Sequence, residues 1–139
     1  MKFITIIGIG LIGSSIARTV KSIDSNIQIN IVDNSKENLE QCRLLKLGNI
    51  FNSEINAKTE ESDIIFVCTP ISAYEEIFNI LNKFELSKAI ISDVGSSKVK
   101  VIELAEKILK NKIFVPGHPI AGTEKSGPQN GFENLFKDK

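Results

Sequence analysis

The chain has 139 residues, with 17 basic and 17 acidic side chains and therefore no formal net charge. This length suits one domain, and a hydrophobic content of 42% is enough to build a core, which argues against disorder. The balanced charge argues against a nucleic-acid partner, and no apolar run approaches the roughly 18 residues that span a membrane. Two cysteines and one histidine make neither a disulfide framework nor a convincing metal site. We expect one cytoplasmic domain over residues 1–139, without a structural metal.

Short β-branched apolar runs alternate with longer amphipathic stretches along the chain. The apolar runs are typical of buried strands and cover residues 3–7, 27–32, 63–68, 89–92 and 112–115, with a weak additional strand near 49–52. The amphipathic stretches have apolar residues at helical spacing and cover residues 11–23, 34–47, 72–83 and 97–110. At the second helix, Asn34 and Glu37 resemble a capping box, and Gly48 stands where a C-terminal cap is expected. After Pro116 we expect a loop or the start of a helix.

This alternation predicts a Rossmann-type α/β domain with a doubly wound, mainly parallel sheet. Strands that are apolar throughout and separated by helices are covered by helices on both faces. Ligands of such sheets bind outside the carboxyl ends of the strands. The residues that follow each strand are therefore the candidates for a functional site.

A glycine motif, G-x-G-x-x-G, occupies residues 8–13, where the first strand meets the first helix. Gly8 allows a tight turn, Gly10 lets a pyrophosphate approach the backbone, and Gly13 lets the helix pack on the strand. The helix N-terminus offers free N–H groups to the phosphates. Asp33, twenty residues beyond Gly13, is placed to bind the ribose hydroxyls of NAD. The alternatives are a glycine-rich turn without a ligand and an aspartate that only forms a turn.

The residues after Asp33 favour NAD over NADP. Asn34 and Ser35 come next, so a 2′-phosphate would meet a carboxylate with only Lys36 nearby. The expected cofactor contacts are Gly8, Gly10, Leu11, Ile12, Gly13, Asp33, Thr69 and Pro70.

Polar loops also follow the later strands, over residues 69–72, 93–98 and 117–127. Each has an ordinary interpretation as a helix-capping loop, with Ser96 or Ser97 as the cap of the fourth helix. His118 is the only histidine, and an imidazole can accept a proton from an alcohol as its carbon loses hydride. A lone histidine can equally be incidental. Cys68, in an apolar strand, is interpreted as a core residue.

Together these motifs resemble the nucleotide-binding domain of prephenate dehydrogenases, over essentially the whole chain. Residues 8–15 look like the family's glycine loop, and residues 93–98 look like its D-x-G-S-x-K loop. Residues 117–127 are close to its G-H-P-[MI]-A-G-x-E-x-S-G signature. This last segment is the specific one, because it separates the chain from hydroxyisobutyrate- and phosphogluconate-type dehydrogenases of the same fold.

The resemblance implies an oxidoreductase of tyrosine biosynthesis that uses NAD to oxidise and decarboxylate prephenate, or arogenate in some relatives. It implies that His118 accepts the proton of the ring hydroxyl as hydride leaves, and that Ser96 helps to hold that hydroxyl and His118. Thr123 and Glu124 would line the substrate pocket. This chemistry needs no metal.

Members of that family continue into a helical domain that forms a dimer and binds the substrate carboxylates, whereas this sequence stops at residue 139. We therefore expect the chain by itself to bind NAD with little turnover, and to form a homodimer only together with such a domain. The alternatives are a stand-alone NAD-binding module without turnover and another hydroxyacid-type dehydrogenase.

Overall fold

The computed structural model describes residues 1–137 and contains one six-stranded sheet in which every neighbouring pair of strands is parallel. The strand order is β3-β2-β1-β4-β5-β6. The strands are β1 (Phe3–Ile7), β2 (Gln28–Val32), β3 (Ile50–Asn52), β4 (Ile64–Val67), β5 (Ile90–Asp93) and β6 (Ile113–Val115). The predicted doubly wound fold is confirmed, and the weak strand near residues 49–52 is a real edge strand.

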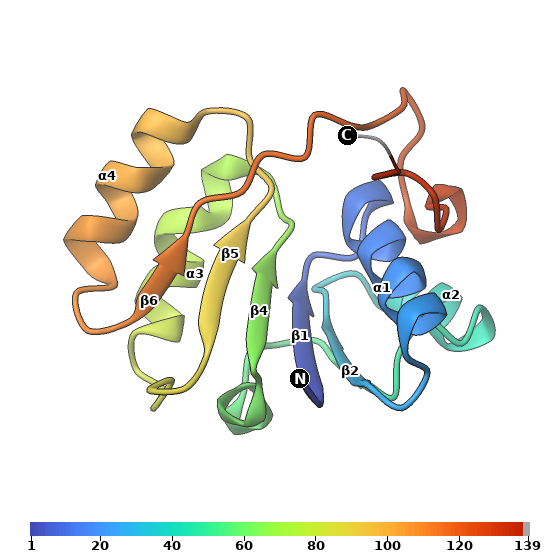
Figure 1. Cartoon of the computed structure of the whole chain (residues 1–139), viewed down its shortest axis with the longest axis horizontal. Helices are drawn as coiled ribbons and strands as arrows, with labels where there is room; N and C mark the ends of the chain where they lie inside the picture. Colours follow the sequence, from blue (N-terminus) through green and yellow to red (C-terminus); the bar gives the residue numbers. More distant parts are fainter. Residues whose placement is uncertain (138–139) are drawn as a thin grey trace.

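Four α-helices cover the two faces of this sheet, and α1 and α2 lie on the side away from α3 and α4 (Figure 1). They are α1 (Leu11–Ile23), α2 (Lys36–Leu44), α3 (Tyr74–Leu81) and α4 (Lys98–Ile108), with short 3-10 helices η1 (Ala57–Glu61), η2 (Ile71–Ala73) and η3 (Pro128–Asn130). Within the described part of the chain, no helix has the length and apolar character needed to cross a membrane.

Successive residues of the central strands point to opposite faces, so each face has its own core. Ile4 and Ile6 of β1 pack with Ile29 and Ile31 of β2 under α1 and α2, and all four side chains are completely buried. On the other face, β4 and β5 pack against α3 and α4. Burial on both faces explains why these strands are apolar throughout rather than alternating.

The ends of α2 differ from the sequence-based prediction. Ser35, not Asn34, is the N-cap, because its hydroxyl accepts the Asn38 N–H at 3.2 Å. The helix stops at Leu44 rather than near residue 47, and the left-handed residue beyond it is Lys46, with φ of 53°. Gly48 is not the cap: a Cβ there would lie 2.8 Å from Cδ1 of Ile31, so glycine is needed where the chain passes close to β2.

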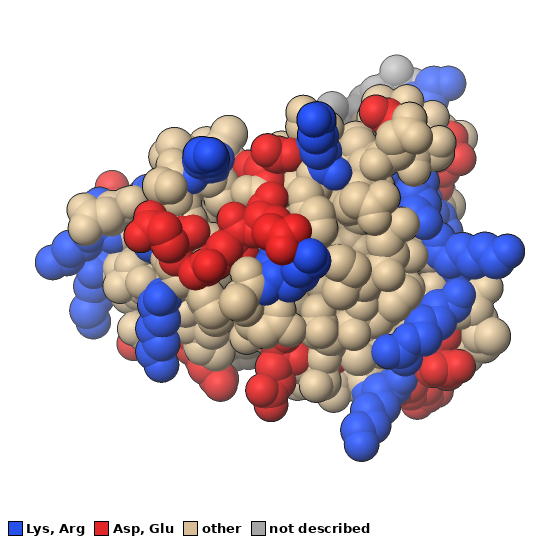
Figure 2. All heavy atoms as spheres, turned by 90° about the horizontal axis from the view of Figure 1, so that it is seen from below, with Lys and Arg blue, Asp and Glu red and all other residues tan. Residues whose placement is uncertain are grey.

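The carboxyl ends of all six strands meet at one edge of the sheet, and the chain after β6 crosses this edge toward α1 and α2 (Figure 1). The opposite edge carries charges of both signs, with acidic side chains gathered in one area and lysines and arginines around it (Figure 2). In a sheet of this kind, the functional site is expected at the carboxyl edge.

Candidate functional site

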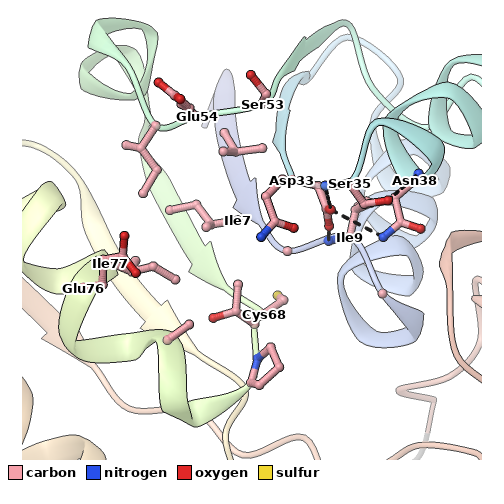
Figure 3. Close-up of a pocket in the computed structure, with 18 of the residues that line it drawn as sticks. Ile7, Ile9, Asp33, Ser35, Asn38, Ser53, Glu54, Cys68, Glu76 and Ile77 are labelled. Carbon is pink, nitrogen blue, oxygen red and sulfur yellow. Dashed lines mark hydrogen bonds between the residues drawn. The ribbon is translucent and has the colours of Figure 1, made fainter.

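A pocket of about 860 Å³ opens at the carboxyl ends of β1, β2 and β4 (Figure 3). Its walls are the glycine loop, the segment that begins at Asp33, the Thr69-Pro70 loop, one face of α3, and Ser126 with Gly127. This volume lies within the range of pockets that hold small molecules and cofactors. Five of the predicted cofactor residues reach the wall: Gly8, Gly10, Asp33, Thr69 and Pro70.

The three glycines of the loop have distinct structural roles. Gly8 has φ of 89°, and a Cβ on it would lie 2.8 Å from Cγ2 of Thr69. A Cβ on Gly13 would lie 2.2 Å from the Gly8 carbonyl oxygen, so α1 can approach the loop only without a side chain there. A Cβ on Gly10 would meet no atom of the described chain within 4 Å. The space at Gly10 is therefore open to a ligand.

The N-terminus of α1 is suited to an anion. Gly10, its N-cap, makes no side-chain capping bond, and the first turn contains no acidic residue. No residue of this turn itself therefore offsets the positive end of the helix dipole. Leu11, Ile12 and Gly13 belong to this turn but do not line the pocket wall.

The Asp33 carboxylate connects the glycine loop to the start of α2 (Figure 3). Its Oδ2 accepts the Ile9 N–H at 2.8 Å, and its Oδ1 accepts the Ser35 N–H at 2.8 Å. Oδ1 also accepts an N–H of the Asn38 side chain at 3.4 Å. A carboxylate offers about four acceptor positions, so Oδ2 can still accept a ligand hydroxyl. Across the pocket, Oγ1 of Thr69 is buried without a hydrogen-bond partner among residues 1–137. Such an atom is uncommon in a folded protein and provides an unused polar group beside the ligand space.

A second cluster centres on Asp93, at the end of β5. Its buried carboxylate accepts the Gly95 N–H at 2.9 Å, the Gly117 N–H at 3.1 Å and the Tyr74 hydroxyl at 3.3 Å. Lys98, at the start of α4, forms an ion pair with it and also donates to the Gly117 carbonyl at 2.6 Å. Burial and the neighbouring Asp93 charge raise the pKa of Tyr74, which keeps its hydroxyl protonated as a donor.

This cluster joins the two loops that carry the predicted catalytic residues. Ser96 lies between Asp93 and Lys98 in the chain, and His118 follows Gly117 directly. Both Ser96 and His118 are exposed at the carboxyl edge and are absent from the wall of the 860 Å³ pocket. Sequence reasoning noted Asp93 and Lys98 only as motif letters and missed their role. The available signal was an aspartate at a strand end followed by a lysine in the first turn of the next helix.

The other residues singled out in the sequence, Thr123, Glu124 and Cys68, lie in different surroundings. Thr123 and Glu124 are exposed and lie outside the pocket wall, and the Thr123 hydroxyl accepts the Lys125 N–H at 3.2 Å. Cys68 packs against the core under α1 and α2 and also lines the pocket, and burial raises the pKa of its thiol. No group of three His, Cys, Asp or Glu side chains suited to a metal ion occurs within residues 1–137.

The sequence is similar to a known protein family and to several named proteins. Residues 16–139 match the family model of the prephenate dehydrogenase nucleotide-binding domain. A cyclohexadienyl dehydrogenase of Zymomonas mobilis is 39% identical over 137 residues, covering 99% of this chain and 47% of the relative. A prephenate dehydrogenase of Lactococcus lactis is 38% identical over 142 residues, covering 99% of this chain and 39% of the relative.

Known structures show the same likeness. The crystal structure of prephenate dehydrogenase from Aquifex aeolicus, in complex with hydroxyphenyl propionate and NAD+, superposes with a TM-score of 0.91 at 33% identity. The alignment covers 100% of this chain and 49% of that one. Synechocystis arogenate dehydrogenase superposes with a TM-score of 0.84 at 28% identity, covering 96% of this chain and 46% of that one. The chain thus spans about half the length of the relatives that it matches, or less.

Proposed function

This chain belongs to the family of prephenate dehydrogenase nucleotide-binding domains, and from that premise we propose that it binds NAD for the oxidative decarboxylation of prephenate to 4-hydroxyphenylpyruvate. One observation carries the proposal. The backbone at Gly10 faces open space beside an uncapped helix N-terminus, with the Asp33 carboxylate in the same pocket. This combination suits a dinucleotide, because backbone N–H groups at a helix N-terminus bind its pyrophosphate and a carboxylate accepts the hydroxyls of its ribose.

Asp33 also supports a preference for NAD over NADP. Both of its oxygens accept backbone N–H groups, which hold the carboxylate in the pocket. The 2′-phosphate of NADP would lie against this negative charge, whereas the 2′-hydroxyl of NAD donates to it. Lys36 is exposed and is the nearest basic residue in the chain after Asp33.

The catalytic part of the proposal concerns the two loops joined by Asp93. His118 accepts the proton of the ring hydroxyl as hydride leaves the same carbon, and Ser96 hydrogen-bonds that hydroxyl. NAD supplies the hydride acceptor. Loss of carbon dioxide para to the new carbonyl makes the ring aromatic, and His118 returns its proton to the phenolate oxygen that results. Thr123 and Glu124, on the same exposed loop, contact the substrate.

The substrate is either prephenate or arogenate, since the similar proteins include dehydrogenases named for each. We further propose that the full enzyme is a cytoplasmic homodimer.

Calorimetric titration of the chain with NAD and NADP tests the cofactor proposal. We expect NAD to bind more tightly than NADP. Gly10→Ala should lower the affinity for NAD at least tenfold, because the added methyl group would occupy the space of the pyrophosphate. Its Tm should not change, because the new Cβ meets no atom of the described chain within 4 Å. Asp33→Asn should lower the affinity for NAD and reduce the ratio of NAD affinity to NADP affinity. Asp24→Asn, an exposed control, should change neither quantity. An absence of NAD binding, or unchanged affinity in Gly10→Ala, would refute the proposal.

The catalytic proposal needs a longer protein. In a chimaera that adds the C-terminal half of the Zymomonas mobilis relative, the rate of NADH formation is followed with prephenate and with arogenate. His118→Asn is expected to lower kcat by orders of magnitude while the affinity for NAD is retained. An active His118→Asn enzyme would contradict the assigned role. No turnover by the unmodified chimaera, with NAD bound normally, would favour a binding module instead.

A further inference from the structure

The chain beyond the His118 loop returns to the nucleotide pocket. Ser126 and Gly127 line the pocket although they lie more than ninety residues from the glycine loop and Asp33 in sequence. The next residues form η3, which packs against α1 and α2, as the red segment in Figure 1 shows. We call residues 126–133 the strap. It lies beside the helix whose N-terminus faces the pocket.

Hydrogen bonds fasten the strap to one face of α1. The Phe132 N–H donates to Oγ of Ser15 at 3.1 Å, and the Thr19 hydroxyl donates to the Glu133 carbonyl at 2.7 Å. Ser15 and Thr19 are four residues apart, so both hydroxyls are on the same side of the helix. Ser15 is completely buried. Thr19 is half-buried and its bond to Glu133 is exposed, so one buried and one accessible hydroxyl hold the strap.

The fit between the strap and α1 is close. A Cβ on Gly131 would lie 2.1 Å from Oγ of Ser14 and 2.9 Å from the Ser15 nitrogen. Pro128 is buried, and Gly127 has φ of 86°, a conformation that favours glycine. The Asn130 side chain donates to the Ser126 carbonyl at 2.5 Å and so ties the last residue of η3 to the segment that precedes it. These contacts set the position of Ser126 and Gly127 against the pocket.

We propose that the strap is a further wall of the NAD site, in which Ser126 and Gly127 contact the diphosphate of the cofactor and Ser15 and Thr19 are positioning residues. The diphosphate is the part of NAD expected nearest the N-terminus of α1, where the strap lies. The proposal rests on NAD binding as proposed above. The proposal also concerns residues 118–125, the loop that carries His118, Thr123 and Glu124. Gly117, directly before this loop, is bonded to Asp93, and Ser126, directly after it, would be bonded to the cofactor, so both ends of the loop would be held.

Four variants of the chain test the strap by NAD titration. Ser15→Ala removes the acceptor for the Phe132 N–H, and Thr19→Val removes the donor to Glu133 while preserving shape. Each substitution should lower the affinity for NAD about five- to tenfold, which is the effect of about one neutral hydrogen bond. Thr19→Ser, which keeps the hydroxyl, should restore most of the affinity. Ser22→Ala is the control, because Ser22 is exposed on the same helix and bonds only to the Thr19 carbonyl.

Hydrogen exchange separates a binding role from a purely structural one. In the unmodified chain, NAD should slow exchange at the amides of Ser126 and Gly127, and Ser126→Ala should weaken NAD without lowering Tm. Full NAD affinity in Ser15→Ala and Thr19→Val, with no protection of residues 126–127, would overturn the strap proposal alone. If the unmodified chain does not bind NAD, the proposed function fails and this inference fails with it.

Discussion

Replacing Lys98 by methionine leaves the Asp93 carboxylate buried without its cation. The Asp93 side chain has 0% exposure and that of Lys98 has 24%, so solvent can compensate little of the lost charge. Breaking a buried pair by removing one partner costs about 3–5 kcal/mol. Three donors to Asp93 remain, namely Gly95, Gly117 and Tyr74, so we expect a loss of about 3 kcal/mol in the free energy of unfolding.

For a domain of this size, a loss of about 3 kcal/mol lowers Tm by roughly 10 °C. Urea and thermal unfolding of the chain measure it, with Lys100→Met, an exposed lysine on the same helix, as the control. The double variant Asp93→Asn with Lys98→Met should recover part of the loss, because no uncompensated charge remains buried. A change below about 1 kcal/mol in Lys98→Met would refute the reasoning.

The same variant also reports on the site. Lys98 donates to the carbonyl of Gly117, the residue before His118, so its loss should free this peptide. Because His118 is the only histidine, its imidazole resonances can be assigned without ambiguity. We expect them to shift, and the Gly117 amide to exchange faster, in Lys98→Met but not in Lys100→Met. Unchanged signals in a folded Lys98→Met chain would show that Asp93 and Lys98 do not position His118.

Three further predictions concern other parts of the chain. Gly13→Ala should destabilise the fold by about 3 kcal/mol or more, measured by urea unfolding, because its Cβ would lie 2.2 Å from the Gly8 carbonyl; a stable variant would contradict the close packing of α1. Asp63 accepts the Lys2 and Phe3 N–H groups, which lowers its pKa, so its contribution to stability is present above the unfolded-state pKa and is lost as pH falls through the lower folded-state value. The difference in Tm between the unmodified chain and Asp63→Asn should therefore shrink in acid below about pH 4, and a constant difference would exclude this cause. Burial raises the pKa of Cys42 to about 12, so iodoacetamide at pH 8 should leave its thiol unmodified in the native chain. Mass spectrometry measures the labelling, and rapid labelling would mean that the core under α1 and α2 opens.

Local patterns in the sequence were sufficient for most of the fold. The alternation of apolar runs and amphipathic stretches predicted a parallel sheet, and the glycine motif with Asp33 identified the edge where the pocket lies. These features depend on neighbours within one element or on one strand-to-helix junction. The prediction was wrong at the two ends of α2, where Ser35, Lys46 and Gly48 take roles that depend on backbone geometry and on contact with β2.

Contacts between distant segments were decided only by the tertiary structure. Asp93 meets Gly117, 24 residues away, because β5 and β6 are adjacent in the sheet. Ser15 meets Phe132, 117 residues away, because the chain after β6 crosses the carboxyl edge back to α1. No periodicity or motif states which residues pair in this way, since Asp93, Gly117, Ser15 and Phe132 are each of an ordinary type in their local sequence. The sequence by itself determined the elements and the glycine loop, whereas the order of the strands determined which loops meet around the pocket.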